Sequence, residues 1–96
     1  MSRMVIGALR LRLVVFGSVS LKDKRRAIKS LKERLIHRFH VSAAEVGSLD
    51  HHQHAELGVA MVANDSAFVT HSLDKMVDYV RQDAAASLVD YEIEVF

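Results

Sequence analysis

Residues 20–39 read SLKDKRRAIKSLKERLIHRF, and the rest of the chain is organised around this stretch. Its apolar residues recur at helical spacing, so we predict one amphipathic helix that packs a narrow stripe on a core. The stripe consists of Ile28, Leu31 and Leu35. Ser20 is a suitable N-cap because its hydroxyl can accept a hydrogen bond from a free first-turn N–H group. Asp23 completes a variant of the capping box and favours the positive end of the helix dipole.

The predicted helix carries most of the positive charge. It holds eight of the thirteen Lys and Arg residues but two of the twelve acids, for a net charge of +6, whereas the rest of the chain has −5. One side of the helix collects the cations Lys22, Arg25, Arg26, Lys29 and Lys32. Ordinary solvated surfaces mix both signs. Two interpretations stand: a face that keeps the protein soluble, or a binding surface for structured RNA, a ribosomal particle or an acidic protein.

The composition indicates one domain, residues 1–96, with a single modest core. Half of the residues are apolar, which argues against disorder, and the absence of cysteine excludes disulfides, thiol catalysis and Cys-based zinc sites. Arg3, Arg10 and Arg12 interrupt the N-terminal apolar residues, so no signal peptide is predicted, and no apolar run is long enough to span a bilayer. We therefore expect a cytoplasmic protein.

Four segments are predicted strands: residues 4–15, 41–50, 54–62 and 88–96. In the first of them, one face carries Val5, Gly7, Leu9, Leu11 and Leu13, and the other carries Ile6, Ala8, Arg10 and Arg12. The second strand alternates weakly between apolar and polar residues, so the pattern does not determine which of its faces is buried. A second helix is predicted from Asn64 or Asp65 to Gln82, with an apolar stripe of Val69, Leu73, Met76 and Val80.

The resulting order is βαββαβ, the ferredoxin-like α+β pattern. Right-handed crossovers place the first and third strands in the centre, with the fourth strand beside the first and the second beside the third (order 4-1-3-2). Both helices then cover one face of the antiparallel sheet. Opposite charges on the other face support this topology, because neighbouring strands would pair them. These charges are Arg10 and Arg12 on the first strand and Asp90, Glu92 and Glu94 on the last.

The open face of the predicted sheet is half apolar. Its apolar members are Ile6, Ala8, Ala60 and Val62. A patch of this kind marks an interface, so a homodimer is one interpretation, whereas isolated surface alanines and valines are ordinary. This face is a poor candidate for RNA because its central strands lack the aromatic residues on which RNA-recognition sheets stack bases.

The segments SLKDKRRAIKSLKERL, RFHVSAAEV and LGVAMVAND resemble, in this order, the bacterial YlxP-like family of unknown function. The resemblance covers nearly the whole chain and implies a ferredoxin-like fold. Members are often encoded near translation and ribosome-maturation factors, which implies a role linked to the ribosome. No catalytic or ligand residues are defined for the family. One stretch departs from it: DHHQHAELG places His52 about where a tryptophan is usual.

His51, His52 and His54 form a cluster beside Asp50. On a strand, His52 and His54 would point the same way and could chelate a transition metal. The cluster lies at a predicted hairpin tip without further ligands, so exposed turn histidines are favoured and no metal site is predicted.

Sequence motifs of enzymes are missing. No spaced motif joins Ser, His and Asp residues, and no Walker loop or GxGxxG is present. Acylphosphatases share the expected architecture and hold phosphate in a glycine-rich loop with an arginine, but VFGSVSLKDKRR at residues 15–26 has one glycine and no such motif. We expect no enzymatic activity, no catalytic residue and no cofactor; a metal-dependent or phosphate-handling enzyme is the alternative. A phosphate group could still bind without chemistry at the start of the basic helix.

Overall fold

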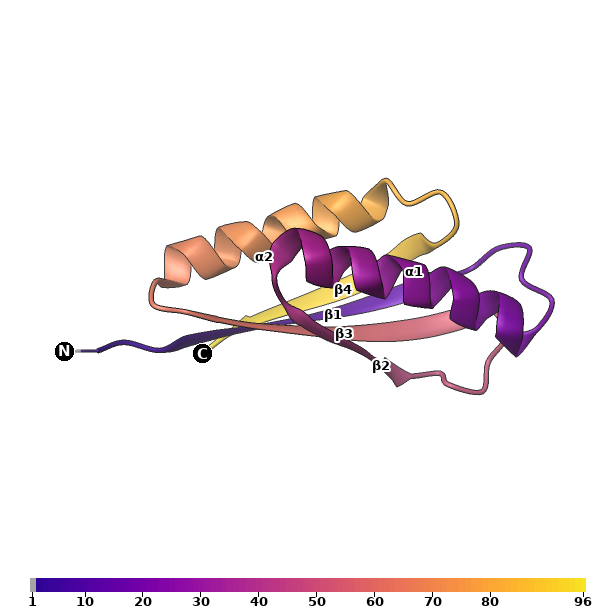
Figure 1. Cartoon of the computed structure of the whole chain (residues 1–96), viewed down its shortest axis with the longest axis horizontal. Coiled ribbons are helices and arrows are strands. Elements are labelled where there is room, and N and C mark those ends of the chain that lie inside the picture. The colour runs from indigo at the N-terminus through magenta and orange to yellow at the C-terminus, as the bar shows by residue number, and fades with distance from the viewer. Residues whose placement is uncertain (1) are drawn as a thin grey trace.

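Four antiparallel strands and two helices make up the computed structural model, which describes residues 2–96. The elements are β1 (Val5–Val14), α1 (Leu21–Phe39), β2 (Ser42–Gly47), β3 (His54–Ala63), α2 (Ser66–Arg81) and β4 (Ser87–Val95). The sheet order is β2-β3-β1-β4, which is the predicted order counted from the other edge. Both helices lie on the same face of the sheet (Figure 1). The predicted ferredoxin-like fold is therefore confirmed.

The core lies between this face and the two helices. Its fully buried members include Leu9, Leu11, Leu13, Leu31, Leu35, Leu57, Val69, Leu73, Met76 and Val80. Each such side chain contributes roughly 1.5–3 kcal/mol through removal from water. The absence of a side chain at Gly7 lets α2 pack closely on the sheet, because a Cβ atom there would overlap Cγ1 of Val69. The small residues of β3, such as Gly58, face the open side instead, and Val46 covers Gly58.

Strand β2 is shorter than the predicted 41–50, because the chain leaves the sheet after Gly47 and turns. Ser48 adopts a left-handed conformation with φ of 56°, which starts this turn. Val41, just before β2, is buried, and Ala43 packs against the core. The face of β2 that carries Ala43 and Glu45 is therefore the one turned toward the core, which the sequence did not determine. The β2–β3 register shifts between Glu45 and Gly47.

The open face of the sheet carries the expected cross-strand charges. Arg10 lies opposite Glu92, and Arg12 lies opposite Asp90. The guanidinium of Arg12 is 3.1 Å from Glu56, 3.6 Å from Asp90 and 3.7 Å from Glu92. These pairs are exposed, so they fix the charge pattern more than they add stability. Beyond Arg12 the β1–β4 register shifts, and Leu88 rather than Val89 lies opposite Leu13.

Both helices begin at the predicted caps. The Ser20 hydroxyl accepts a hydrogen bond from the N–H of Asp23, and Asp65 accepts one from the N–H of Phe68. The Asp23 carboxylate accepts a hydrogen bond from the N–H of Val19, one residue before the position that a capping box uses. The Ser20 hydroxyl thus satisfies one of the free N–H groups in the first turn of α1. Neither helix is long and apolar enough to cross a membrane.

Candidate functional site

The five cations predicted to share one side of α1 do lie together at the surface. Lys22, Arg25, Arg26 and Lys29 are exposed and Lys32 is half-buried. We call these five residues the basic strip. Across residues 2–96, the ion pairs involve other cations, and no member of the basic strip pairs with a carboxylate. Glu33, four residues after Lys29, forms no ion pair in the same range, so the positive charge of the strip is uncompensated.

Part of the basic strip lines a shallow groove between α1 and the edge strand β2. The groove is lined by Arg25, Ile28, Lys29, Lys32 and Glu45. The strip therefore extends down the flank of α1 that faces β2, which explains why Lys32 is half-buried. Glu45 is the acid in this groove, and its charge is already engaged from below, by Lys24.

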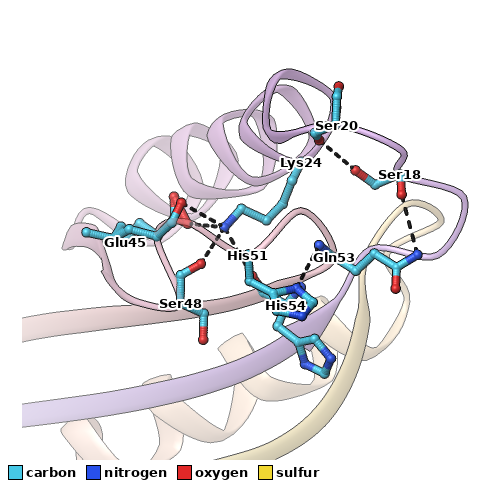
Figure 2. Close-up of polar contacts among 9 residues, drawn as sticks. Ser18, Ser20, Lys24, Glu45, Ser48, His51, Gln53 and His54 are labelled. Carbon is cyan, nitrogen blue, oxygen red and sulfur yellow. Dashed lines mark hydrogen bonds and ion pairs between the residues drawn. The ribbon is translucent and has the colours of Figure 1, made fainter.

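Lys24 is a fully buried residue that the sequence interpretation did not single out. Its Nζ is 3.2 Å from Oε2 of Glu45 and donates hydrogen bonds to the carbonyl oxygens of Ser48 at 2.7 Å and His54 at 3.1 Å. A longer contact of 3.4 Å reaches the carbonyl oxygen of Leu49. Figure 2 shows the ammonium surrounded by these groups. Lys24 thereby ties the start of α1 to the β2–β3 connection.

The position of Lys24 carried a signal that could have identified it. Lys24 lies four residues before Ile28 and seven before Leu31, on the same stripe as the core residues of α1. A charge on a core stripe is expected to have buried partners. Oε2 of Glu45 is itself buried and accepts no well-oriented hydrogen bond, so the ammonium of Lys24 is its charged neighbour.

The β2–β3 connection is also held by His51 and Gln53. Nδ1 of His51 accepts hydrogen bonds from the backbone N–H groups of Gln53 and His54, at 3.1 and 3.0 Å. The side chain of Gln53 donates to the carbonyl oxygen of Ser18, and its carbonyl accepts from the N–H of Val15. The connection is therefore bonded to the loop that precedes α1 as well as to Lys24 (Figure 2).

The histidine cluster does not have the predicted strand geometry. His54 is the first residue of β3, whereas His52 lies in the turn, so the two do not share a strand face. The rings of His51 and His54 meet edge to face with centroids 4.3 Å apart, and Nδ1 of His51 is occupied by backbone donors. Within residues 2–96, no three His, Cys, Asp or Glu side chains converge as metal ligands would.

The opposite flank of α1 faces α2 and carries compensated charge. Arg34 is 2.7 Å from Asp83 and donates a hydrogen bond to the hydroxyl of Tyr79 at 3.3 Å. Burial raises the pKa of Asp83, but hydrogen bonds from Arg34 and from the N–H groups of Ala86 and Ala85 outweigh it, so the pKa lies below the usual value. The bond to Asp83 raises the pKa of Arg34.

Comparison with known proteins places the chain in a family. A model of the family described as "Protein of unknown function (DUF503)" matches residues 6–93. The chain belongs to the DUF503 family. The uncharacterized protein YlxP of Bacillus subtilis (strain 168), which the predicted YlxP-like resemblance anticipated, is 26% identical over 76 residues, which cover 79% of this chain and 83% of that one.

This DUF503 protein is also similar to solved structures. The de novo designed protein Foldit4 has a TM-score of 0.55 with 16% identity, over 98% of this chain and 97% of that chain. The 30S ribosomal protein S6 of Thermotoga maritima has a TM-score of 0.47 with 6% identity, over 100% of this chain and 89% of that chain.

Replacing Lys24 with Met should lower the free energy of unfolding by about 3–5 kcal/mol, because it leaves a buried carboxylate and several carbonyl groups without a donor. Chemical denaturation followed by circular dichroism measures the change. Lys22→Met, an exposed position in the same helical turn, serves as the control and should stay within about 0.5 kcal/mol of the parent. Lys24→Met/Glu45→Leu should recover part of the loss. Equal stability of the two single variants would contradict the assigned role of Lys24.

Acidification should loosen the β2–β3 connection through His51. The pKa of His51 is lowered from its ordinary 6.5 by desolvation, and then by the positive charges of His54, His52 and Lys24. The unfolded chain therefore takes up this proton at a higher pH than the folded chain. The stabilisation that His51 provides is present above about pH 6.5 and is lost as the pH falls through the lowered pKa.

The measurement is amide hydrogen exchange by NMR across this pH range. Protection of the N–H groups of Gln53 and His54 should fall as His51 becomes protonated, since both donate to its Nδ1. In His51→Gln the pH dependence of this protection should disappear. A His51 titration midpoint at or above 6.5 would contradict the expectation.

Proposed function

We propose that this protein is a non-enzymatic accessory protein of the cytoplasm that binds structured RNA or a ribosomal particle through the basic strip of α1. The observation that carries the proposal is the uncompensated charge of the strip: five cations on one helix, none of them paired with a carboxylate within residues 2–96. Folded proteins rarely gain stability from crowding like charges on one helix. A polyanion would neutralise them all at once.

The spacing of the strip suits a phosphate backbone. Apart from the consecutive Arg25 and Arg26, members recur every three or four residues, so these cations are separated by about 5 Å along the helix axis. Contacts of this kind fix a protein on nucleic acid without reading its sequence. The open face of the sheet is the poorer surface for RNA, because the exposed carboxylates of Asp90, Glu92 and Glu94 would repel phosphate.

Binding should be strongly salt-dependent. If all five strip residues contact phosphates, the logarithm of the association constant should fall with the logarithm of salt concentration with a slope of about −4. A fourfold rise in salt should then weaken binding by about 10²- to 10³-fold. Filter binding with ribosomal RNA at two salt concentrations measures this, and Arg25→Glu/Arg26→Glu should abolish binding at the lower concentration.

The matched control is Arg3→Glu/Arg81→Glu, which makes the same change in net charge at exposed positions outside α1. It should retain most of the affinity. Association that is insensitive to salt, or that survives reversal of Arg25 and Arg26, would refute the proposal. Sedimentation of cell lysate at low and high salt then tests whether the protein cosediments with ribosomal particles.

A second candidate function is a homodimeric interaction module that docks its basic helix on an acidic protein. The observation that favours it is the apolar patch on the open face of the sheet. Ile6 lies opposite Val62, and Ala8 lies opposite Ala60, so the four predicted patch residues are contiguous. Phe96 extends the patch, because its backbone pairs with Ile6, and it is 68% exposed. Partners that remain bound after nuclease treatment would favour this candidate over RNA.

Dimerisation through this patch should be sensitive to charge. Light scattering across a concentration series should give a mass rising from one chain to two for the parent protein. Ile6→Glu/Val62→Glu should hold it at one chain, because the buried carboxylates would be unpaired. Val19→Glu, at an exposed position outside the patch, should dimerise like the parent. A single-chain mass for the parent at every concentration would rule out the dimer.

A further inference from the structure

A hollow between α1 and α2 combines an aromatic ring with polar groups of both charges. It is wide open to solvent and is lined by Ser30, Glu33, Arg34, His37, Arg38 and Tyr79. Its residues belong to α1 and α2, which lie on the same face of the sheet (Figure 1).

The ring of Tyr79 is held in place by two contacts. Its hydroxyl accepts a hydrogen bond from Arg34, which is itself anchored on Asp83. Phe39 meets the ring edge to face, with centroids 5.7 Å apart. Such contacts orient an aromatic ring before any ligand arrives. Tyr79 nevertheless remains partly exposed, so its position suits stacking as well as packing.

Arg38 adds a second planar group, which lies over this ring. Its guanidinium carbon is 5.1 Å from the centroid of Tyr79, and within residues 2–96 it pairs with no carboxylate. The Tyr79–Arg38 pair also borders a further hollow on the side of Phe39 and Lys75. Aromatic rings and guanidinium planes are the two groups on which proteins stack unpaired bases.

The position of Glu33 favours a nucleotide over a bare phosphate as the ligand of this hollow. Its exposed carboxylate lines the same hollow as Arg34 and Arg38, and it belongs to no ion pair of the described residues. A site for phosphate alone would not include an acceptor that repels it. A nucleobase supplies N–H groups that can donate to this carboxylate. The phosphate of the nucleotide would lie near Arg38, because Arg34 is already paired with Asp83.

We infer that the Tyr79–Arg38 pair binds the base of an unpaired nucleotide, with Glu33 accepting N–H groups of its edge. This inference rests on the proposed function, because the basic strip on the same helix would hold the neighbouring RNA backbone. RNA bound by this protein would then contain a loop, a bulge or a single-stranded end next to its paired region. Guanine, whose edge presents two adjacent N–H donors, suits the carboxylate best.

The chain offers a clean spectroscopic test because it contains two tyrosines and no tryptophan. In Tyr91→Phe, Tyr79 is the sole tyrosine, and proton NMR follows its ring directly. Guanosine monophosphate should shift these resonances upfield in a saturable manner. Ribose 5-phosphate, which has the phosphate and lacks the base, should not. The absence of a shift, or an equal shift with ribose 5-phosphate, would overturn the inference.

RNA-binding experiments test whether the bound base belongs to an unpaired stretch of RNA. Tyr79→Leu should weaken binding of a hairpin with an unpaired loop by about tenfold and leave a blunt duplex unaffected, whereas Tyr79→Phe should keep the preference for the hairpin. Equal effects of Tyr79→Leu on both RNAs, or none on either, would overturn the assignment to unpaired RNA.

The two proposals fail in different ways. Arg25→Glu/Arg26→Glu, combined with Tyr91→Phe, should lose RNA while keeping the shift caused by guanosine monophosphate. If that shift occurs but the strip reversal leaves RNA affinity unchanged, the basic strip is refuted and the nucleotide site stands. RNA binding through the strip without any shift of Tyr79 refutes the nucleotide site alone.

Discussion

One buried positive charge constrains this molecule more than any other single interaction. An ammonium that is excluded from water must find an acceptor for each of its N–H groups. Lys24 finds them on β2, in the turn that follows, and at the first residue of β3. The β2–β3 connection therefore cannot move relative to α1 without leaving charge unpaired. The same constraint sets the separation of α1 and β2, and with it the groove that Arg25, Lys29 and Lys32 line.

The distribution of carboxylates follows from this arrangement. Glu45 compensates Lys24 beneath the helix, and Asp83 compensates Arg34 on its α2 flank. On the far side of the sheet, three acids gather around Arg12. The acids of these ion pairs lie below α1, beside it, or across the sheet, and within residues 2–96 none of the ion pairs includes a member of the basic strip. The small net charge of +1 conceals this separation.

Periodicity was sufficient to predict the fold, because each helix has one apolar stripe and β1 alternates between two faces. The caps at Ser20 and Asp65 were predictable for the same reason: their chemistry is local. The exposure of the basic strip also followed from helical spacing. Interactions distant in the sequence were not predictable. The place of Lys24 on the apolar stripe signalled its burial, but its partners lie more than 20 residues away and could not be predicted. The end of β2 was misplaced because Lys24 draws the following turn toward α1. The hollow at Tyr79 depends on how two helices pack, which no single helical pattern reveals.

The register shifts in β2 and β4 have a consequence for how copies of the chain can meet. These are the two outer strands, and each departs from regular pairing with its inner neighbour. Irregular edges hinder the addition of further strands, which is the route by which sheets grow into fibrils. On β4 the row of acids adds electrostatic repulsion to the irregular geometry. We therefore expect the protein to tolerate crowding without polymerising, because neither edge of the four-stranded sheet favours the addition of another strand.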